Sequence, residues 1–114
     1  MKLDRYTIAL LLSRPDAPQL GGDAVSELQN AHMAHLADLH EAGHLLAAGP
    51  LLDETYRGLS ILRVDPERAR EFKEQDPAVR AGRFSIVVIP WLVPSGVIAF
   101  PPGRLPRSTA EVDA

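Results

Sequence analysis

The stretch from Glu27 to Pro50 carries all four histidines and constrains the fold more than any other part of the chain. At about 100° per residue, its apolar side chains and two of its histidines gather on one side of a helix. A helix in a globular protein normally buries such a stripe against the core. The sequence therefore predicts an amphipathic helix whose buried stripe, roughly 100° wide, holds Leu28, His32, His35, Leu36 and Leu39.

Both ends of this helix have local signals. Ser26 and Gln29 match the Ser-x-x-Gln pattern of a capping box, which predicts a first turn there; Asp23 is an alternative start. Gly43 follows the last periodic position and is expected to end the helix in the left-handed conformation. The preceding segment, 15–23, contains two prolines and two glycines and is interpreted as a plain connecting loop, with a loop that overhangs a pocket as the alternative.

The rest of the chain supplies short apolar runs and two Asp-Pro pairs. In each pair the aspartate can cap a helix and the proline fits its first position. Pro50 and Pro90 lie within apolar runs, which predicts edge strands or bends at these places. The expected strands are 6–13, 44–52, 58–64 and 84–93, and the expected further helices are 66–75 and a short turn at 77–82 that follows Asp76.

This order of elements, βαββαβ, predicts a ferredoxin-like α+β fold with two helices on one face of a four-stranded antiparallel sheet. The strands at 6–13 and 84–89 are apolar on both faces. A bare apolar sheet face of that size usually marks an interface. We therefore expect a homodimer that forms through the free face of the sheet.

The chain divides at about residue 93. Residues 1–93 are expected to form one domain, whereas residues 94–114 are rich in proline and glycine and are interpreted as a tail. Within the tail, the segment 96–100 has three open interpretations: a further strand, a segment over the partner subunit, or disorder.

Composition excludes several classes of function. The net charge is −3 and the 12 basic residues are scattered, which argues against nucleic-acid binding. The absence of cysteine excludes disulfides and thiolate chemistry. No apolar run reaches the roughly 20 residues that span a bilayer, and Asp4 interrupts any export signal. We therefore expect a cytoplasmic protein that binds neither nucleic acid nor membrane.

His32 and His35 lie in the stripe of the predicted helix where apolar side chains would pack better. An imidazole in that position suits proton transfer near neutral pH, so His32 is the candidate general acid or base. The alternative is a structural histidine whose nitrogen bonds a backbone carbonyl. His35 either lines the same pocket and contacts a substrate or packs against a neighbour, and packing is favoured. His40 and His44 do not join this pair easily by helix geometry, so no metal site is predicted.

Four other residues are candidates for the same site, each with a simpler alternative. Asp76 is favoured as the cap before Pro77, and the alternatives are that it orients His32 or binds a substrate. Ser60 could donate a hydrogen bond into the same cavity or be a small, inert residue of a strand. Arg57 and Arg83 could hold an anionic substrate, but a solvated surface position is favoured for both.

The chain resembles the YCII-related (YciI-like) domain family. The similarity rests on an ordered set of short motifs that together span residues 6–93. These motifs are HMAHL at 32–36, HEAG at 40–43, LAAGPL at 46–51, RGLSI at 57–61, DPAVRAG at 76–82 and PW at 90–91.

The resemblance implies a dimeric α/β barrel and a functional histidine on the first helix at the position of His32. Family members often pair this histidine with an acid, and some carry an aspartate on the first strand. This sequence has Leu11, Leu12 and Ser13 there. Asp76 is then the nearest matching acid.

One type in the family is similar to a dehydrochlorinase of chlorinated hydroxyquinols. The resemblance therefore implies a small lyase or isomerase. From the histidine in the apolar stripe we expect a mostly apolar cavity between the sheet and the first helix of each subunit, in which His32 acts as acid or base without a cofactor. The expected substrate is a cyclic or carbonyl-containing molecule that reacts through an enol-type intermediate. The alternative function is a homodimer that binds or senses a small ligand without catalysis.

Overall fold

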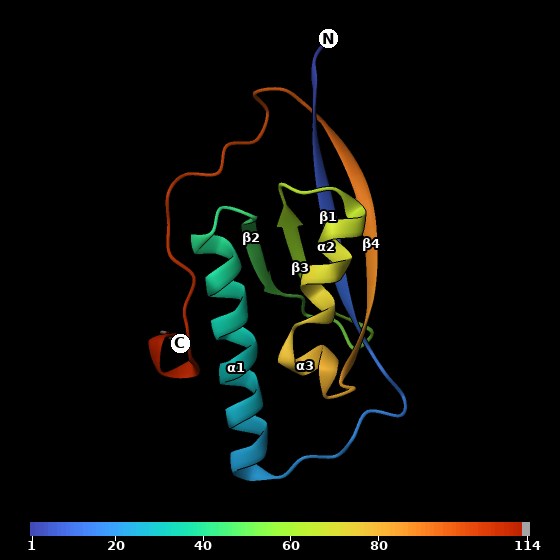
Figure 1. Cartoon of the computed structure of the whole chain (residues 1–114), viewed down its shortest axis with the longest axis vertical. Coiled ribbons are helices and arrows are strands. Elements are labelled where there is room, and N and C mark those ends of the chain that lie inside the picture. The colour runs from blue at the N-terminus through green and yellow to red at the C-terminus, as the bar shows by residue number, and fades with distance from the viewer. Residues whose placement is uncertain (113–114) are drawn as a thin grey trace.

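The computed structural model describes residues 1–112 of the chain and contains the predicted βαββαβ order (Figure 1). The four strands form one antiparallel sheet in the order β2-β3-β1-β4, as in a ferredoxin-like α+β fold. The strands are β1 (Leu3–Ser13), β2 (Leu45–Pro50), β3 (Tyr56–Leu62) and β4 (Phe84–Pro94), and the helices are α1 (Gly22–Glu41), α2 (Pro66–Glu74), α3 (Pro77–Arg80) and the 3₁₀ turn η1 (Thr109–Glu111).

The helices α1, α2 and α3 cover the same face of the sheet (Figure 1). Side chains alternate between the two faces of a strand, so every second residue of β1 points toward the helices. Ala9 of β1 packs there with Leu62 of β3, Leu39 of α1 and Ala69 of α2. This layer between sheet and helices is the core of the described chain.

The start of α1 was predicted wrongly. The helix begins at Gly22, one turn before Ser26, and its cap residue Gly21 makes no side-chain bond. No breaker follows Gly22, and Asp23 in the first turn interacts favourably with the helix dipole, so the helix extends past the capping-box signal. The predicted end is confirmed, because Gly43 follows the helix with φ +84°.

Both Asp-Pro signals are confirmed as helix caps. Asp65 accepts a hydrogen bond from the backbone N–H of Arg68 at 2.8 Å and opens α2. Asp76 accepts one from the backbone N–H of Ala78 at 2.9 Å and opens α3. The cap at Asp76 matters for the site, because it fixes where that carboxylate lies.

The prolines within strands lie at the sheet edges, as expected. β2 contains Pro50, β4 contains Pro90, and both are edge strands, where a missing N–H removes no bond of the ladder. β2 is shorter than predicted. Its irregularity lies between Leu45 and Ala47 rather than at Gly49-Pro50.

The C-terminal segment passes along the outer side of α1 (Figure 1). Arg107 pairs with Asp38 at 2.9 Å and with Glu41 at 2.7 Å. Residues 96–100 do not form a strand, and the ring of Phe100 contacts that of Tyr6 edge-on at a centroid distance of 5.5 Å. Up to residue 112, the tail is therefore docked on its own chain.

An ammonium group lies inside the core layer. Lys73 of α2 is fully buried, and its Nζ donates to Ser60 Oγ of β3 at 2.6 Å. Burial lowers the pKa of Lys73 to about 8, while the charge of Asp76 acts in the opposite direction. The folded protein thus releases this proton at a lower pH than the unfolded chain.

Replacing Asp65 by Ala is expected to lower the free energy of unfolding by about 1 kcal/mol, because the N–H groups of the first turn lose an acceptor. Ser26→Ala removes the residue that the sequence marked as a cap but that lies exposed within α1. It should change stability by less than about 0.5 kcal/mol. Urea denaturation of both variants measures the contrast, and a larger loss in Ser26→Ala would contradict the assigned helix start.

Stability is expected to rise with pH above about 8, by at most about 1.4 kcal/mol per pH unit. Between pH 8 and 10.5 the unfolded chain still holds the Lys73 proton that the folded chain has lost, so the unfolded state binds more protons. Urea denaturation at pH 7 to 10.5 should show this rise in the wild type and in Lys2→Met, which removes an exposed lysine. Lys73→Met should lack it, and a rise of the same size in that variant would exclude Lys73 as the source.

Candidate functional site

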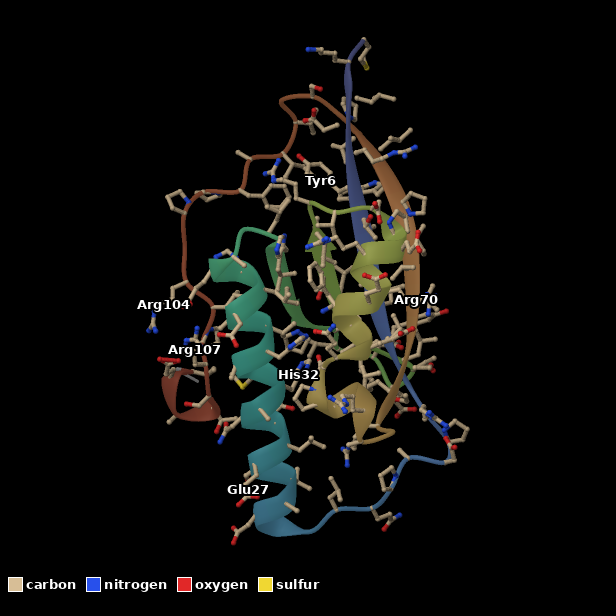
Figure 2. The ribbon with its side chains drawn as sticks, viewed as in Figure 1. Tyr6, Glu27, His32, Arg70, Arg104 and Arg107 are labelled. Atoms are coloured by element: carbon tan, nitrogen blue, oxygen red, sulfur yellow. The ribbon has the colours of Figure 1, made fainter. Side chains whose placement is uncertain are left out.

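The structure brings His32 and Asp76 together from different elements. His32 lies on the side of α1 that faces α2 and α3 (Figure 2), and Asp76 lies between those two helices. The distance between His32 Nδ1 and Asp76 Oδ2 is 2.6 Å. This is the pairing that the sequence and the family resemblance suggested, although a catalytic role for either residue stays a prediction.

Asp76 is fully buried, and each of its oxygens has a partner. Oδ2 contacts His32, whereas Oδ1 accepts from the backbone N–H of Ala78. The two interpretations of this residue, helix cap and histidine partner, are therefore both realised. A buried carboxylate needs such partners, because an unpaired one costs several kcal/mol.

The contact with an ionised Asp76 determines which nitrogen of a neutral His32 ring carries the proton. An ionised carboxylate can only accept, so Nδ1 of His32 donates, and a neutral ring then has a free lone pair at Nε2. The side chain of His32 is 14% exposed. An oriented ring with one free nitrogen and some access to solvent is able to accept a proton from a bound molecule.

Lys73 was not predicted to be near this site. Its charge interacts with Asp76 from inside the core, and its ammonium donates to Ser60. The side chain of Ser60 is buried, and its Oγ accepts from the lysine, so a contact between Ser60 and a substrate finds no support in the geometry. The available signal was spacing, since Lys73 follows the inward positions Ala69 and Phe72 at helical intervals.

His35 has a structural contact. Its Nε2 donates to the backbone carbonyl of Phe72 at 3.0 Å, which links α1 to α2. The favoured interpretation, packing, describes this contact, whereas substrate binding by His35 finds no support in the geometry. His44 stacks on the ring of Phe72, and His40 lies between the carbonyl oxygens of Leu45 and Gly103.

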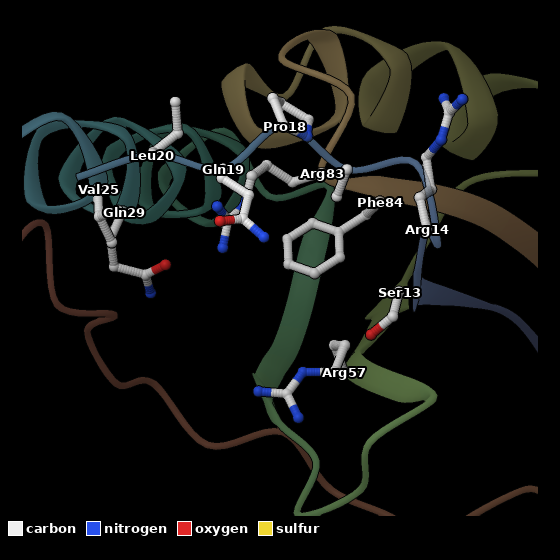
Figure 3. A pocket seen from close by; sticks show the side chains of 11 residues that line it. Ser13, Arg14, Pro18, Gln19, Leu20, Val25, Gln29, Arg57, Arg83 and Phe84 are labelled. Atoms are coloured by element: carbon white, nitrogen blue, oxygen red, sulfur yellow. The ribbon is translucent and has the colours of Figure 1, made fainter.

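A hollow lies beside this pair rather than around it. It has a volume of about 500 Å³ and is lined by the segment 13–20, the first half of α1, the start of β4 and Arg57 (Figure 3). The loop before α1 is therefore part of a pocket and not the plain connector that was favoured. Arg57 lies in the wall, whereas His32 is not among the lining residues.

The character of this hollow differs from the expectation. A mostly apolar cavity was predicted, but three arginines, two glutamines and a serine take part in the wall. A second hollow of about 40 Å³ shares Gln29, Arg83 and Phe84 with the first and extends to Ala78. Arg83, for which a solvated position was favoured over contact with an anionic substrate, takes part in the wall of both hollows.

Within residues 1–112, no three residues of the types that bind metals are grouped closely enough to hold an ion. In the same part of the chain, no helix is long and apolar enough to cross a membrane.

Comparison with solved structures gives a fold neighbour. It is the 5-chloro-2-hydroxyhydroquinone dehydrochlorinase TftG from Burkholderia phenoliruptrix AC1100, solved in complex with 2,5-dihydroxybenzoquinone. The similarity covers 75% of this chain and 92% of that chain, with a TM-score of 0.57 and 23% sequence identity. At this identity the likeness supports the fold alone.

A search of curated proteins gave no significant match. The family model of the YCII-related domain matches residues 8–92, which include all four strands in whole or in large part and the His32–Asp76 pair. The chain therefore belongs to the YCII-related domain family.

Proposed function

We propose that this protein is a small acid–base enzyme of the lyase or isomerase type, in which His32 moves a proton on a cyclic or carbonyl-containing molecule without a cofactor. The observation that carries the proposal is the 2.6 Å contact between His32 Nδ1 and the buried carboxylate of Asp76. A histidine that only filled space would not require an ionisable group, itself costly to bury, at that position.

The chemistry follows from the orientation of the ring. Nε2 of His32 accepts a proton from a carbon next to a carbonyl or from a ring hydroxyl, and the substrate becomes an enolate. The carboxylate of Asp76 stabilises the imidazolium that forms. The enolate then expels a leaving group in an elimination, or takes the proton back at another carbon in an isomerisation.

The choice of substrate class is supported by family and fold. Hydroxylated rings that interconvert with quinones form enolates readily, and the fold neighbour TftG is named for a chlorinated hydroxyhydroquinone and holds a benzoquinone. Together with membership of the YCII-related family, this makes hydroxyquinols and quinones the first compounds to test.

A homodimer is part of the proposal. The sheet face opposite the helices is apolar across β3, β1 and β4, where Ile8 pairs with Ile61 and Ile89. Val87 is 37% and Ile89 43% exposed. An apolar face of this kind is stabilised when a second copy covers it.

Replacing His32 by Gln is expected to lower turnover of a hydroxyquinol or quinone substrate by roughly 10²- to 10⁴-fold, because the proton acceptor is lost. Asp76→Asn keeps a residue that can cap α3 but removes the charge, and it should lower turnover by at least about tenfold. The assay follows absorbance of the ring and, for 5-chloro-2-hydroxyhydroquinone, release of chloride.

The matched control is His44→Gln, which removes a histidine that stacks on Phe72 away from Asp76. It should retain wild-type turnover. Full turnover in His32→Gln would overturn the acid–base proposal.

Light scattering of the wild type at micromolar concentration is expected to give about twice the chain mass of 12.4 kDa. Ile89→Asp should give monomers, since it would bury an unpaired carboxylate in the interface. Leu92→Asp is the control, because Leu92 is an exposed apolar residue of the same strand that alternates to the other face. A monomeric wild type, or equal dissociation by both variants, would contradict the proposed interface.

A further inference from the structure

The hollow beside the His32–Asp76 pair collects positive charge from distant parts of the sequence. Arg14 follows β1, Arg57 lies on β3 and Arg83 precedes β4, yet all three take part in one wall. Among the residues that the structure describes, none that lines this hollow is acidic, although the chain as a whole has a net charge of −3. Like charges that are gathered in a concave site favour an anion there.

Within residues 1–112, two of the three guanidinium groups form no ion pair with a carboxylate. Arg14 is compensated by Asp16, which it contacts through two hydrogen bonds of 2.9 and 2.7 Å. Arg57 donates only to the backbone carbonyl of Asp53, and in residues 1–112 no acid lies within ion-pair distance of Arg57 or Arg83. Both groups therefore keep donors that suit a carboxylate or an ionised hydroxyl.

The same wall contains an aromatic surface and neutral amides. In the view of Figure 3 the ring of Phe84 lies between the side chains of Arg83 and Arg57, with the amide of Gln19 next to Arg83. An aromatic face flanked by guanidinium groups suits a planar ring that carries negative charge. The volume of about 500 Å³ accommodates a single substituted ring with room for water.

The hollow is connected to the proposed catalytic pair through Ala78. Its N–H bonds Asp76, its carbonyl accepts from the backbone N–H of Arg83 at 3.1 Å, and it lines the smaller hollow that shares Arg83 and Phe84 with the larger one. Ala78 therefore positions both the carboxylate of Asp76 and the backbone of Arg83.

We infer that this hollow is the substrate-binding site and that it selects small planar ring anions, with Arg83 and Arg57 bound to the carboxylate or ionised hydroxyl and Phe84 stacked on the ring. The inference rests on the proposed function, which it narrows from cyclic molecules in general to anionic ones. It also adds Phe84 to the residues that the sequence singled out.

The test is calorimetric titration of the full-length protein with 2,5-dihydroxybenzoate and with its uncharged analogue 2,5-dihydroxybenzyl alcohol. The benzoate should bind at least about tenfold more tightly than the alcohol, because only it forms charge-assisted hydrogen bonds. Arg83→Gln and Arg57→Gln should each raise its Kd by about tenfold or more, and added salt should weaken binding. Equal affinity for acid and alcohol would overturn the inference.

The matched control is Arg70→Gln, which removes an equal charge from the exposed side of α2. It should leave the Kd unchanged. Inorganic phosphate is the second probe, since it carries charge without a ring. If phosphate binds as tightly as the benzoate, or if Arg70→Gln weakens binding as much as Arg83→Gln, the arginines act only as diffuse surface charge and the inference fails.

The same titrations on His32→Gln separate this inference from the proposed function. Arg83-dependent binding that persists in His32→Gln supports the site whether or not turnover is found. Turnover that depends on His32 but has the same KM in Arg83→Gln as in the wild type would refute the site and leave the acid–base proposal standing.

Discussion

The buried carboxylate of Asp76 is the constraint on which the rest of the site depends. One oxygen opens α3 through the N–H of Ala78, and the other receives Nδ1 of His32. The first bond is the helix cap that an Asp-Pro start forms within its own first turn. The second uses the carboxylate that the cap has already positioned, so the imidazole is oriented by a group that cannot easily move.

The buried carboxylate of Asp76 also determines the electrostatics of the core around it. A carboxylate without exposure to water requires positive charge or donors nearby, and the chain places His32 on one side and the ammonium of Lys73 on α2. Lys73 in turn requires an acceptor, which Ser60 supplies. Asp76 interacts favourably with both His32 and Lys73, which helps so small a core to accommodate a lysine that hydrophobic packing would exclude.

The elements that the sequence predicted well are those with local causes. Asp65 and Asp76 open helices, Gly43 ends one, and Pro90 marks an edge strand, because each effect acts within a few residues. The pairing of His32 with Asp76 required the family resemblance, since the two lie 44 positions apart. The spacing of Lys73 after Ala69 and Phe72 carried a local signal that it faces the core, but the convergence of the arginines could not be predicted, because it arises only when distant strands are brought together.

The hollow and the proposed catalytic histidine lie close together along α1. Gln29 lies in the wall of the hollow, and His32 lies about one turn further along the same helix. A rise of 1.5 Å per residue puts these positions about 4.5 Å apart along the axis, less than the width of a substituted ring. A ring held by Arg83 through its anionic group would need to extend its opposite edge past Gln29 to meet Nε2 of His32. The placement therefore favours substrates whose acidic group and reacting carbon lie on opposite sides of one ring, over those in which the two are adjacent.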